Sequence, residues 1–314
     1  EGIATYSNTF LNNDLGVNLL AGGNIQTYLL KSNSANTNQG LIVPDLYAIS
    51  NSKATPSVGN GRLERRVNSW FGSADVEFRK FVSATFAMRQ DWSSTLPAGN
   101  NKLSYPSAGV AFIPSELFKS SMPSWFTFAK IYGSWGKKPL TLDIYQNNFL
   151  YDIQQNQWNG NFLTTTPGTI PDPTLKGSLI TSYEAGLDLR FIKNKLGVLI
   201  NYYNETAADQ PVGVSISGVS GFTTRIVNAS TVKRSGIEVT INGNVVSNKN
   251  FNWTLTKTFG WLMKNPVTKI IEGQDKLLLG AGTFGTRYAR AFQEINKDWG
   301  QLIGGGFTTN SSGQ

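Results

Sequence analysis

The sequence contains no cysteine and no histidine among its 314 residues. Without cysteine there can be no disulfide, thiolate zinc site or cysteine nucleophile, and without histidine there can be no imidazole metal ligand and no Ser-His-Asp triad. Charged side chains are also scarce, at 15% of the residues, whereas aromatic side chains reach 12% and glycine occurs 32 times. The composition therefore excludes several large classes of enzyme and favours aromatic strands joined by glycine-containing loops.

Long hydrophobic runs are missing as well. No stretch of 18 apolar residues occurs, so the sequence predicts no transmembrane helix. Residues 1–4 lack the basic and apolar parts of a signal peptide. A mature chain, or a piece of a longer one, would look the same, so this absence does not indicate a cytoplasmic protein.

What the sequence does contain is an alternation of apolar and polar residues with a period of two. In residues 182–191, Tyr183, Leu187 and Phe191 occupy odd positions, and polar residues such as Glu184 occupy even ones. A helix cannot produce this pattern, whereas a strand with one apolar and one polar face does. The pattern recurs in 73–78, 83–89, 196–203, 237–242 and 251–259.

Short and long connections alternate along the chain. Short polar turns are predicted at 79–80, 193–195 and 247–250, and long polar connections at about 31–62, 90–103, 137–178 and 205–232. Predicted strands run to about 9–13 residues, which suits a tilted membrane strand. Many of them end in tryptophan, namely Trp70, Trp92, Trp125, Trp135, Trp253 and Trp261. This is typical of an outer-membrane β-barrel, with tight turns on the periplasmic side and long loops outside.

One residue departs from the pattern. Lys257 falls in register with the apolar face of 251–259. We expect either a β-bulge there or a position near the lipid headgroups, where the long side chain can reach water.

Several segments resemble the barrel of SusC/RagA-like TonB-dependent transporters. The stretch RVNSWFG (66–72) leads through a short turn to a strand that ends RQDWSS (89–94), and LSYPSAGVAFIPSE follows (103–116). The segment 228–246 is similar to the family's N-x-G-x-x-x-N-x-G-(I/V)-E signature, although Ser230 and Arg234 replace the more usual Gly and Asn. Further similar segments are 130–137 and 171–205.

The resemblance implies an all-β fold, part of a large antiparallel up-and-down transmembrane β-barrel with long extracellular loops. It implies that residues 1–314 are an internal segment of a longer polypeptide, with the plug domain and the remaining strands outside this chain. The implied activity is active import of a large nutrient, an oligosaccharide or a peptide, across a Bacteroidetes-type outer membrane. The implied partners are a SusD-like lipoprotein, a TonB complex acting through the plug, and outer-membrane lipid.

No catalytic, cofactor-binding or metal-binding residue is predicted. Residues 280–285 read G-x-G-x-x-G, but too little chain follows to complete a dinucleotide-binding unit. Glu184 and Asp188 share a strand face roughly 13 Å apart, too far for a glycosidase pair. The lysine and arginine residues are dispersed along the chain, which argues against nucleic-acid binding.

Aromatic side chains in the connection 137–178 are the candidate ligand-binding residues. Tyr145, Tyr151 and Trp158 lie among Asn and Gln residues, a combination that suits sugar rings or peptides. Packing of this loop on its neighbours or on a partner protein is an equal alternative. Two other functions remain open at this level, a passive porin of 12–14 strands formed by this chain alone and a secreted, soluble β-sandwich that binds glycans.

Overall fold

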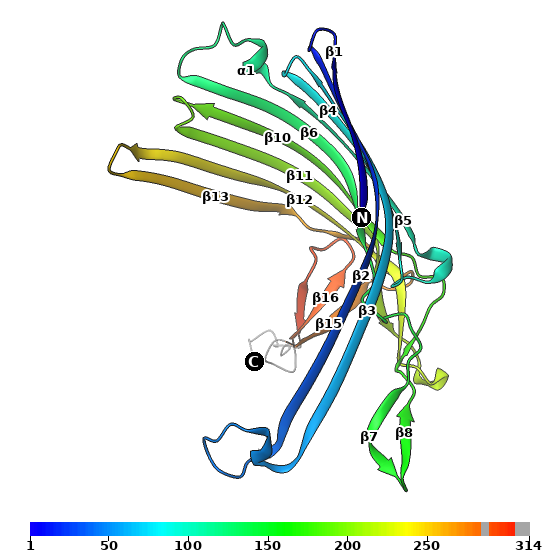
Figure 1. Cartoon of the computed structure of the whole chain (residues 1–314). Helices are drawn as coiled ribbons and strands as arrows, with labels where there is room; N and C mark the ends of the chain where they lie inside the picture. Colours follow the sequence, from blue (N-terminus) through cyan, green and yellow to red (C-terminus); the bar gives the residue numbers. More distant parts are fainter. Residues whose placement is uncertain (284–288, 305–314) are drawn as a thin grey trace, which may run out of the picture.

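The computed structural model describes residues 1–283 and 289–304. Ten strands pair in antiparallel succession to form one long curved sheet (Figure 1). None of the described helices has the length and hydropathy needed to span a bilayer. In spatial order the strands are β1 (Gly2–Phe10), β2 (Leu15–Leu41), β3 (Ser52–Phe78), β4 (Val82–Ser93), β5 (Lys102–Phe112), β6 (Phe126–Leu140), β10 (Ser178–Phe191), β11 (Leu196–Ser215), β12 (Thr224–Ser247) and β13 (Asn252–Lys264). The predicted all-β, antiparallel up-and-down fold is confirmed.

Smaller elements lie around this sheet. The hairpin of β7 (Asp152–Trp158) and β8 (Asn161–Thr165) stands apart, and β9 (Thr169–Ile170) and β14 (Val267–Lys269) pair with β12. A second sheet contains β15 (Lys276–Thr283), β16 (Ala289–Glu294) and β17 (Gln301–Gly304). The helical turns are η1 (Ile49–Asn51), η2 (Ala98–Asn100), α1 (Pro114–Leu117) and η3 (Gly218–Ser220).

The predicted short turns are confirmed, and they lie at one end of the sheet (Figure 1). Arg79 and Lys80 join β3 to β4 with φ of 48° and 62°. Two consecutive left-handed residues give the backbone a twist that matches the strands they join, which explains so tight a turn. The connection between β5 and β6 is an exception at this end, because it spans 113–125 and contains α1.

Two of the four predicted long connections, 31–62 and 205–232, are wrong in their bounds, whereas those at about 90–103 and 137–178 agree with the structure. β2 and β3 each continue for 27 residues, through most of 31–62, and β11 and β12 likewise extend into 205–232. The strands are therefore longer than the 9–13 residues expected from hydropathy. Hydropathy marks where apolar side chains end, but the backbone ladder continues beyond that point, since polar strand residues satisfy the same hydrogen bonds.

One face of the sheet is apolar across all ten strands and remains exposed. Ile200 of β11 lies opposite Leu187 of β10 and Val239 of β12, and Val239 lies opposite Phe259 of β13. Many outward residues are more than a third exposed, among them Leu19, Val76, Phe86, Val110, Ile131, Tyr183, Ile200, Tyr202, Ile241, Leu255 and Phe259. In the described part of the chain no second layer covers this outward face, which argues against a soluble β-sandwich.

Aromatic residues mark both ends of the outward face. Trp125, just before β6, stacks on Phe191 at 6.0 Å between ring centroids, near the short turns. At the other end Trp135 lies opposite Tyr183 on the next strand. Two such aromatic girdles flank the apolar band of outer-membrane barrels.

Lys257 lies on the outward face without a bulge at its position. It pairs in regular register with Ile241, and its Nζ lies 4.8 Å from the centre of the Phe259 ring. The expectation of a bulge is therefore wrong. The contact with Phe259 is a cation–π interaction, which partly compensates the cation on an apolar face.

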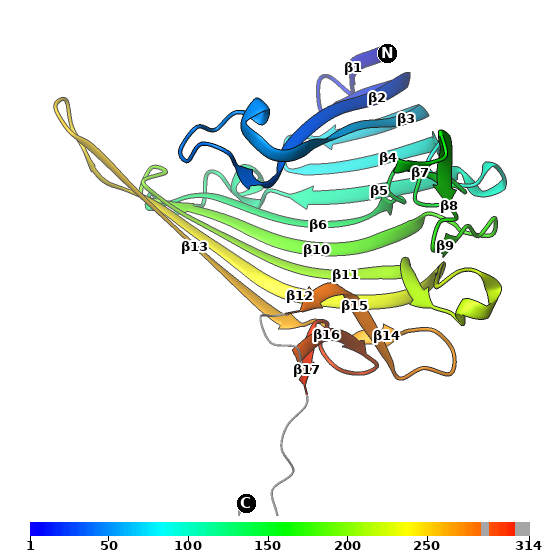
Figure 2. The ribbon, with the colours of Figure 1, turned by 90° about the horizontal axis from the view of Figure 1, so that it is seen from below.

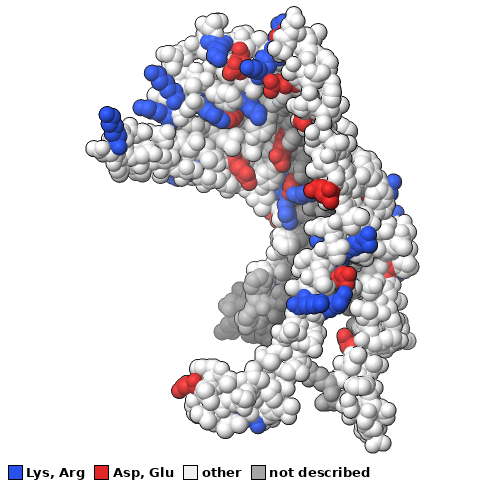
Figure 3. Space-filling model, viewed as in Figure 1, with Lys and Arg blue, Asp and Glu red and all other residues white. Residues whose placement is uncertain are grey.

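The opposite face is polar and lines the hollow of the curved sheet. Figure 2 shows this side of the sheet, with β15, β16 and β17 beside β12 at one edge. Figure 3 shows charged side chains of both signs gathered in the hollow. The smaller sheet is attached to β12, since Gln293 of β16 accepts a hydrogen bond of 2.5 Å from the buried hydroxyl of Ser230.

Candidate functional site

The first polar cluster of the concave face is centred on Arg89 in β4. Its Nε donates to Asp91 Oδ1 at 2.9 Å and its Nη2 donates to Ser69 Oγ of β3 at 2.9 Å. The Tyr105 hydroxyl of β5 donates to Asp91 Oδ2 at 2.5 Å. The Arg89 guanidinium also lies 5.3 Å from the centre of the Phe71 ring. Three strands thus hold one charge-neutral cluster through hydrogen bonds that charge strengthens.

A second cluster lies on β6, β10 and β11. Glu205 accepts from Lys138 Nζ at 3.0 Å and from the Ser182 hydroxyl at 3.1 Å. Beside it the Tyr132 hydroxyl donates to Asn201 Oδ1 at 2.5 Å. The adjoining groove has a volume of about 290 Å³ and is lined by Glu184, Asn201, Tyr203, Glu205, Arg234 and Glu238.

The chemistry of this face is that of a polar wall. Cations and carboxylates neutralise one another across neighbouring strands, while hydroxyl and amide groups remain to exchange hydrogen bonds with polar solutes. In the described ranges, no group of three or more acidic side chains is placed to hold a metal ion. The arrangement suits the passage or weak binding of polar molecules.

The three aromatic residues predicted to bind ligand all lie in the connection between β6 and β10. Trp158 and Tyr151 lie at and beside the β7–β8 hairpin and are 73% and 59% exposed. The Tyr151 ring meets Phe149 edge-on at 5.1 Å. Tyr145 lies nearer the start of the same connection, where its backbone is left-handed with a φ of 64°. Within the described chain, no ring contact joins Tyr145, Tyr151 and Trp158.

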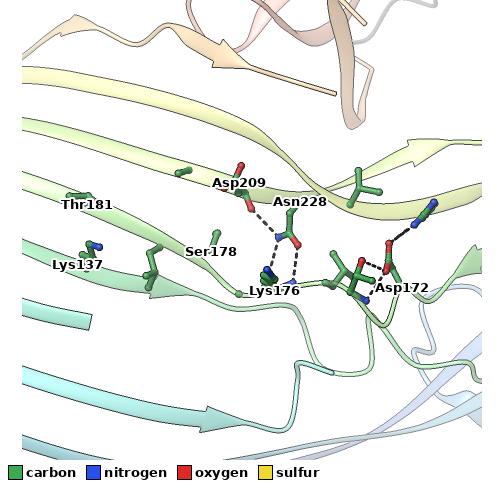
Figure 4. Close-up of a pocket in the computed structure, with 14 residues that line it drawn as sticks. Lys137, Asp172, Lys176, Ser178, Thr181, Asp209 and Asn228 are labelled. Atoms are coloured by element: carbon green, nitrogen blue, oxygen red, sulfur yellow. Dashed lines mark hydrogen bonds and ion pairs between the residues drawn. The ribbon is translucent and has the colours of Figure 1, made fainter. Parts of the chain in front are cut away.

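Asp172 anchors the long connection between β6 and β10 to the sheet. Its carboxylate accepts from Arg225 Nη2 of β12 at 2.7 Å and from the Thr174 hydroxyl at 2.6 Å, and its side chain is only 5% exposed (Figure 4). Leu142 and Leu175 of the same connection pack with Ile226 of β12. Burial acts to raise the pKa of Asp172, but the hydrogen bonds from Thr174 and Arg225 outweigh it and lower the pKa.

This anchor predicts an acid-sensitive loop. Because the pKa of Asp172 is lower in the folded protein, the stabilisation is complete above its ordinary value and is lost as the pH falls through the lowered value. We expect limited proteolysis within 141–177 to accelerate below about pH 4. The Asp172→Asn variant should be cleaved rapidly already at pH 7, and its rate of cleavage should no longer depend on pH. Equal cleavage of the variant and the parent at pH 7 would contradict the anchor.

Several residues of the concave face escaped sequence analysis. The sequence predicts that Glu184 and Asp188 share one strand face, but it does not group Arg89, Asp91, Tyr105 and Glu205. Alternation could have assigned each to the polar face, whereas their pairing needs the register between strands. Residues 280–283 of the G-x-G-x-x-G sequence are in β15, and 284–285 are outside the described residues.

Comparison with known proteins agrees with this geometry. The profile of the family described as TonB dependent receptor-like, beta-barrel matches residues 2–314. TonB-dependent receptor P3 of Formosa agariphila is 26% identical over 77% of this chain and 24% of its own length. TonB-dependent receptor SusC of Bacteroides thetaiotaomicron is 24% identical over 66% of this chain and 21% of its own length.

Solved structures show the same fold. One described as the RagAB peptide transporter superposes with a TM-score of 0.74 at 19% identity, covering 94% of this chain and 32% of the other. The outer-membrane transporter YddB from Escherichia coli gives a TM-score of 0.57 at 14% identity, covering 94% and 38%. The chain thus spans about a quarter of the length of the curated relatives and about a third of the solved ones.

The matched family is one of membrane receptors rather than enzymes. An apolar outward face, a polar concave face and aromatic residues at both ends are the features of an outer-membrane wall. The chain belongs to the TonB-dependent receptor-like β-barrel family, related to SusC/RagA-type transporters, and forms part of an outer-membrane barrel.

Proposed function

We propose that this chain is one arc of a larger barrel that actively imports a large polar nutrient, an oligosaccharide or a peptide, across the outer membrane. The observation that carries the proposal is the sorting of the two sheet faces within a TonB-dependent receptor barrel. The outward face suits lipid, and the concave face offers paired charges and hydrogen-bonding groups to a polar solute.

The open edges of the sheet support a larger barrel. Among the described strands, β1 pairs only with β2, and β13 pairs only with β12. A strand edge left unpaired in hydrocarbon costs several kcal/mol for each exposed backbone group. Further strands would satisfy these edges, which favours an arc of a larger barrel over a porin closed by this chain alone.

The proposed partners follow from the family resemblance. A TonB complex would open a plug that lies outside this chain, and a SusD-like lipoprotein would cover the external face. The relative described as the RagAB peptide transporter carries peptides, and the long external connections here bear exposed aromatic and amide side chains that suit either peptides or sugars.

The test is energy-dependent uptake in cells that express the full-length protein. Labelled oligosaccharides and peptides above the size limit of general porins are supplied to a deletion strain with and without the restored gene. We expect uptake of one class to require the gene, TonB and the proton-motive force. Gene-dependent uptake that persists without TonB would show a passive channel, and no gene-dependent uptake of either class would contradict the proposal.

The exposed aromatic side chains of the external connection are proposed to capture substrate. We expect Tyr151→Ala combined with Trp158→Ala to raise the apparent KM for uptake by between about fivefold and about 150-fold with little change in maximal rate, since each of the two stacked rings contributes about 0.5–1.5 kcal/mol. Tyr47→Ala is the matched control, because Tyr47 is an aromatic side chain that is 87% exposed on a different connection. Unchanged uptake in the double variant would assign these rings to loop packing.

A further inference from the structure

Outward-facing cations form a band at the end of the sheet opposite the short turns, just beyond the aromatic residues there. Lys102 lies opposite Trp92, and Lys137 follows Trp135 by two residues on the same face of β6. Two residues of strand correspond to about 7 Å. The outward basic band, as we define it, consists of Arg66, Lys102, Lys137, Lys233 and Lys264.

Strand register places these residues on the outward face. Lys137 lies opposite Thr181, two residues from Tyr183 in β10. Lys233 lies opposite Thr206, and Lys264 lies opposite Ser235. Thr206 and Ser235 belong to the outward set, because Ser235 pairs with Asn204, which itself pairs with the outward Tyr183. Arg66 Nε donates to Asn68 Oδ1 at 3.2 Å, as expected for neighbours on one strand face.

The band differs from the cations of the concave face in its partners. Inward cations such as Arg89, Lys138 and Arg190 each form an ion pair with a carboxylate within 3.0 Å. In the described part of the chain, no ion pair involves any member of the outward basic band. A row of uncompensated cations on one level of a membrane wall attracts anions.

A groove opens beside this band. It has a volume of about 770 Å³, and Lys137, Leu179, Thr181 and Ala208 of the outward set line it together with Ser178, Asp209 and part of β12 (Figure 4). Lys176 of the 141–177 connection also lines it.

The acidic side chains of the groove are already neutralised. Asp172 pairs with Arg225 at 2.7 Å, and Asp209 pairs with Lys269 at 2.9 Å. Lys137 and Lys176 therefore remain as uncompensated positive charges in the groove.

We propose that the outward basic band and its groove bind the phosphate groups of a phosphorylated glycolipid in the outer leaflet. The aromatic residues place the band at the headgroup level, and the end with long connections faces outward in barrels of this kind. Ammonium groups donate to phosphate oxygens, while the apolar face below accepts the acyl chains. This inference rests on membrane placement and is independent of the transported solute.

The test uses the full-length protein purified in mild detergent, with co-purified lipid A measured by mass spectrometry. In the band variant, Lys102, Lys137 and Lys233 are each replaced by glutamine. In the control variant, Lys80, Lys193 and Lys249 of the short turns are replaced by glutamine, so that the change in net charge is the same. Each lysine near an anionic lipid surface increases the binding constant for that lipid roughly fivefold.

We expect the band variant to retain less than about a tenth of the phosphorylated lipid A and the control to retain all of it. Lipid A without phosphates is then added to the parent protein. We expect its binding to be as weak as the binding of phosphorylated lipid A to the band variant. The proposal would be overturned if both variants retained phosphorylated lipid A equally or lost it equally. It would also be overturned if the parent protein bound dephosphorylated and phosphorylated lipid A equally well. Heat-modifiable electrophoretic mobility shows that each variant is folded.

Discussion

The substitution Ile200→Arg is expected to prevent most of the protein from reaching its folded, membrane-inserted state. The neighbouring substitution Leu199→Arg is expected to be tolerated. Ile200 faces outward in the middle of the apolar belt, between Leu187 and Val239. Leu199 faces the concave side, between Asp188 and Thr240. Arginine on the lipid face near the bilayer centre costs about 2–4 kcal/mol, while substitutions on the inner face cost much less.

These neighbours form a well-matched pair, because Leu199 and Ile200 are 37% and 36% exposed. Simple loss of burial would therefore affect Leu199→Arg and Ile200→Arg equally. The readout is the fraction of folded protein in the outer membrane of cells, followed by urea unfolding in lipid vesicles. If both variants assembled equally well, the outward face would not contact lipid and the barrel assignment would fail.

The strand faces could be predicted from the sequence because alternation is a local property. Tyr183, Leu187 and Phe191 occupy one face of β10 as the period of two requires, and the whole outward face is built from such strands. The extent of β2 and β3 could not be predicted in the same way. In 31–41 and 52–62 serine, threonine and asparagine are frequent on both faces, so hydropathy carries no signal, although the backbones remain paired.

The candidate site was less accessible to sequence analysis, because its contacts depend on register. Arg89 and Asp91 are two residues apart on one strand, and alternation places both on the polar face. Their partners Ser69 and Tyr105 come from two other strands. Asp172 and Arg225 are 53 residues apart and meet only because the connection folds back onto β12. The aromatic loop residues could be named but not positioned, since hydropathy does not determine loop geometry.

Removal of the Asp91 carboxylate is the second change expected to have a large effect. Asp91→Ala takes away the acceptor of both Arg89 Nε and the Tyr105 hydroxyl, at a side chain only 14% exposed. A partly buried cation and a hydroxyl group left without their acceptor cost about 2–4 kcal/mol together. Arg89 keeps its bond to Ser69, which places the expected loss below that of a fully buried pair.

Asp188→Ala serves as the comparison for this change. Asp188 pairs with Arg190 on the same concave face, but the Arg190 side chain is 48% exposed and can be solvated by water, so we expect a loss of at most about 1 kcal/mol. Both are measured as the free energy of urea unfolding in lipid vesicles. The double variant Arg89→Ala with Asp91→Ala should recover part of the loss, because the cation left unpaired is then absent. An Asp91→Ala variant no less stable than Asp188→Ala would mean that the hydrogen bonds joining β3, β4 and β5 through Arg89 do not stabilise the wall, and that water satisfies these groups in the open lumen.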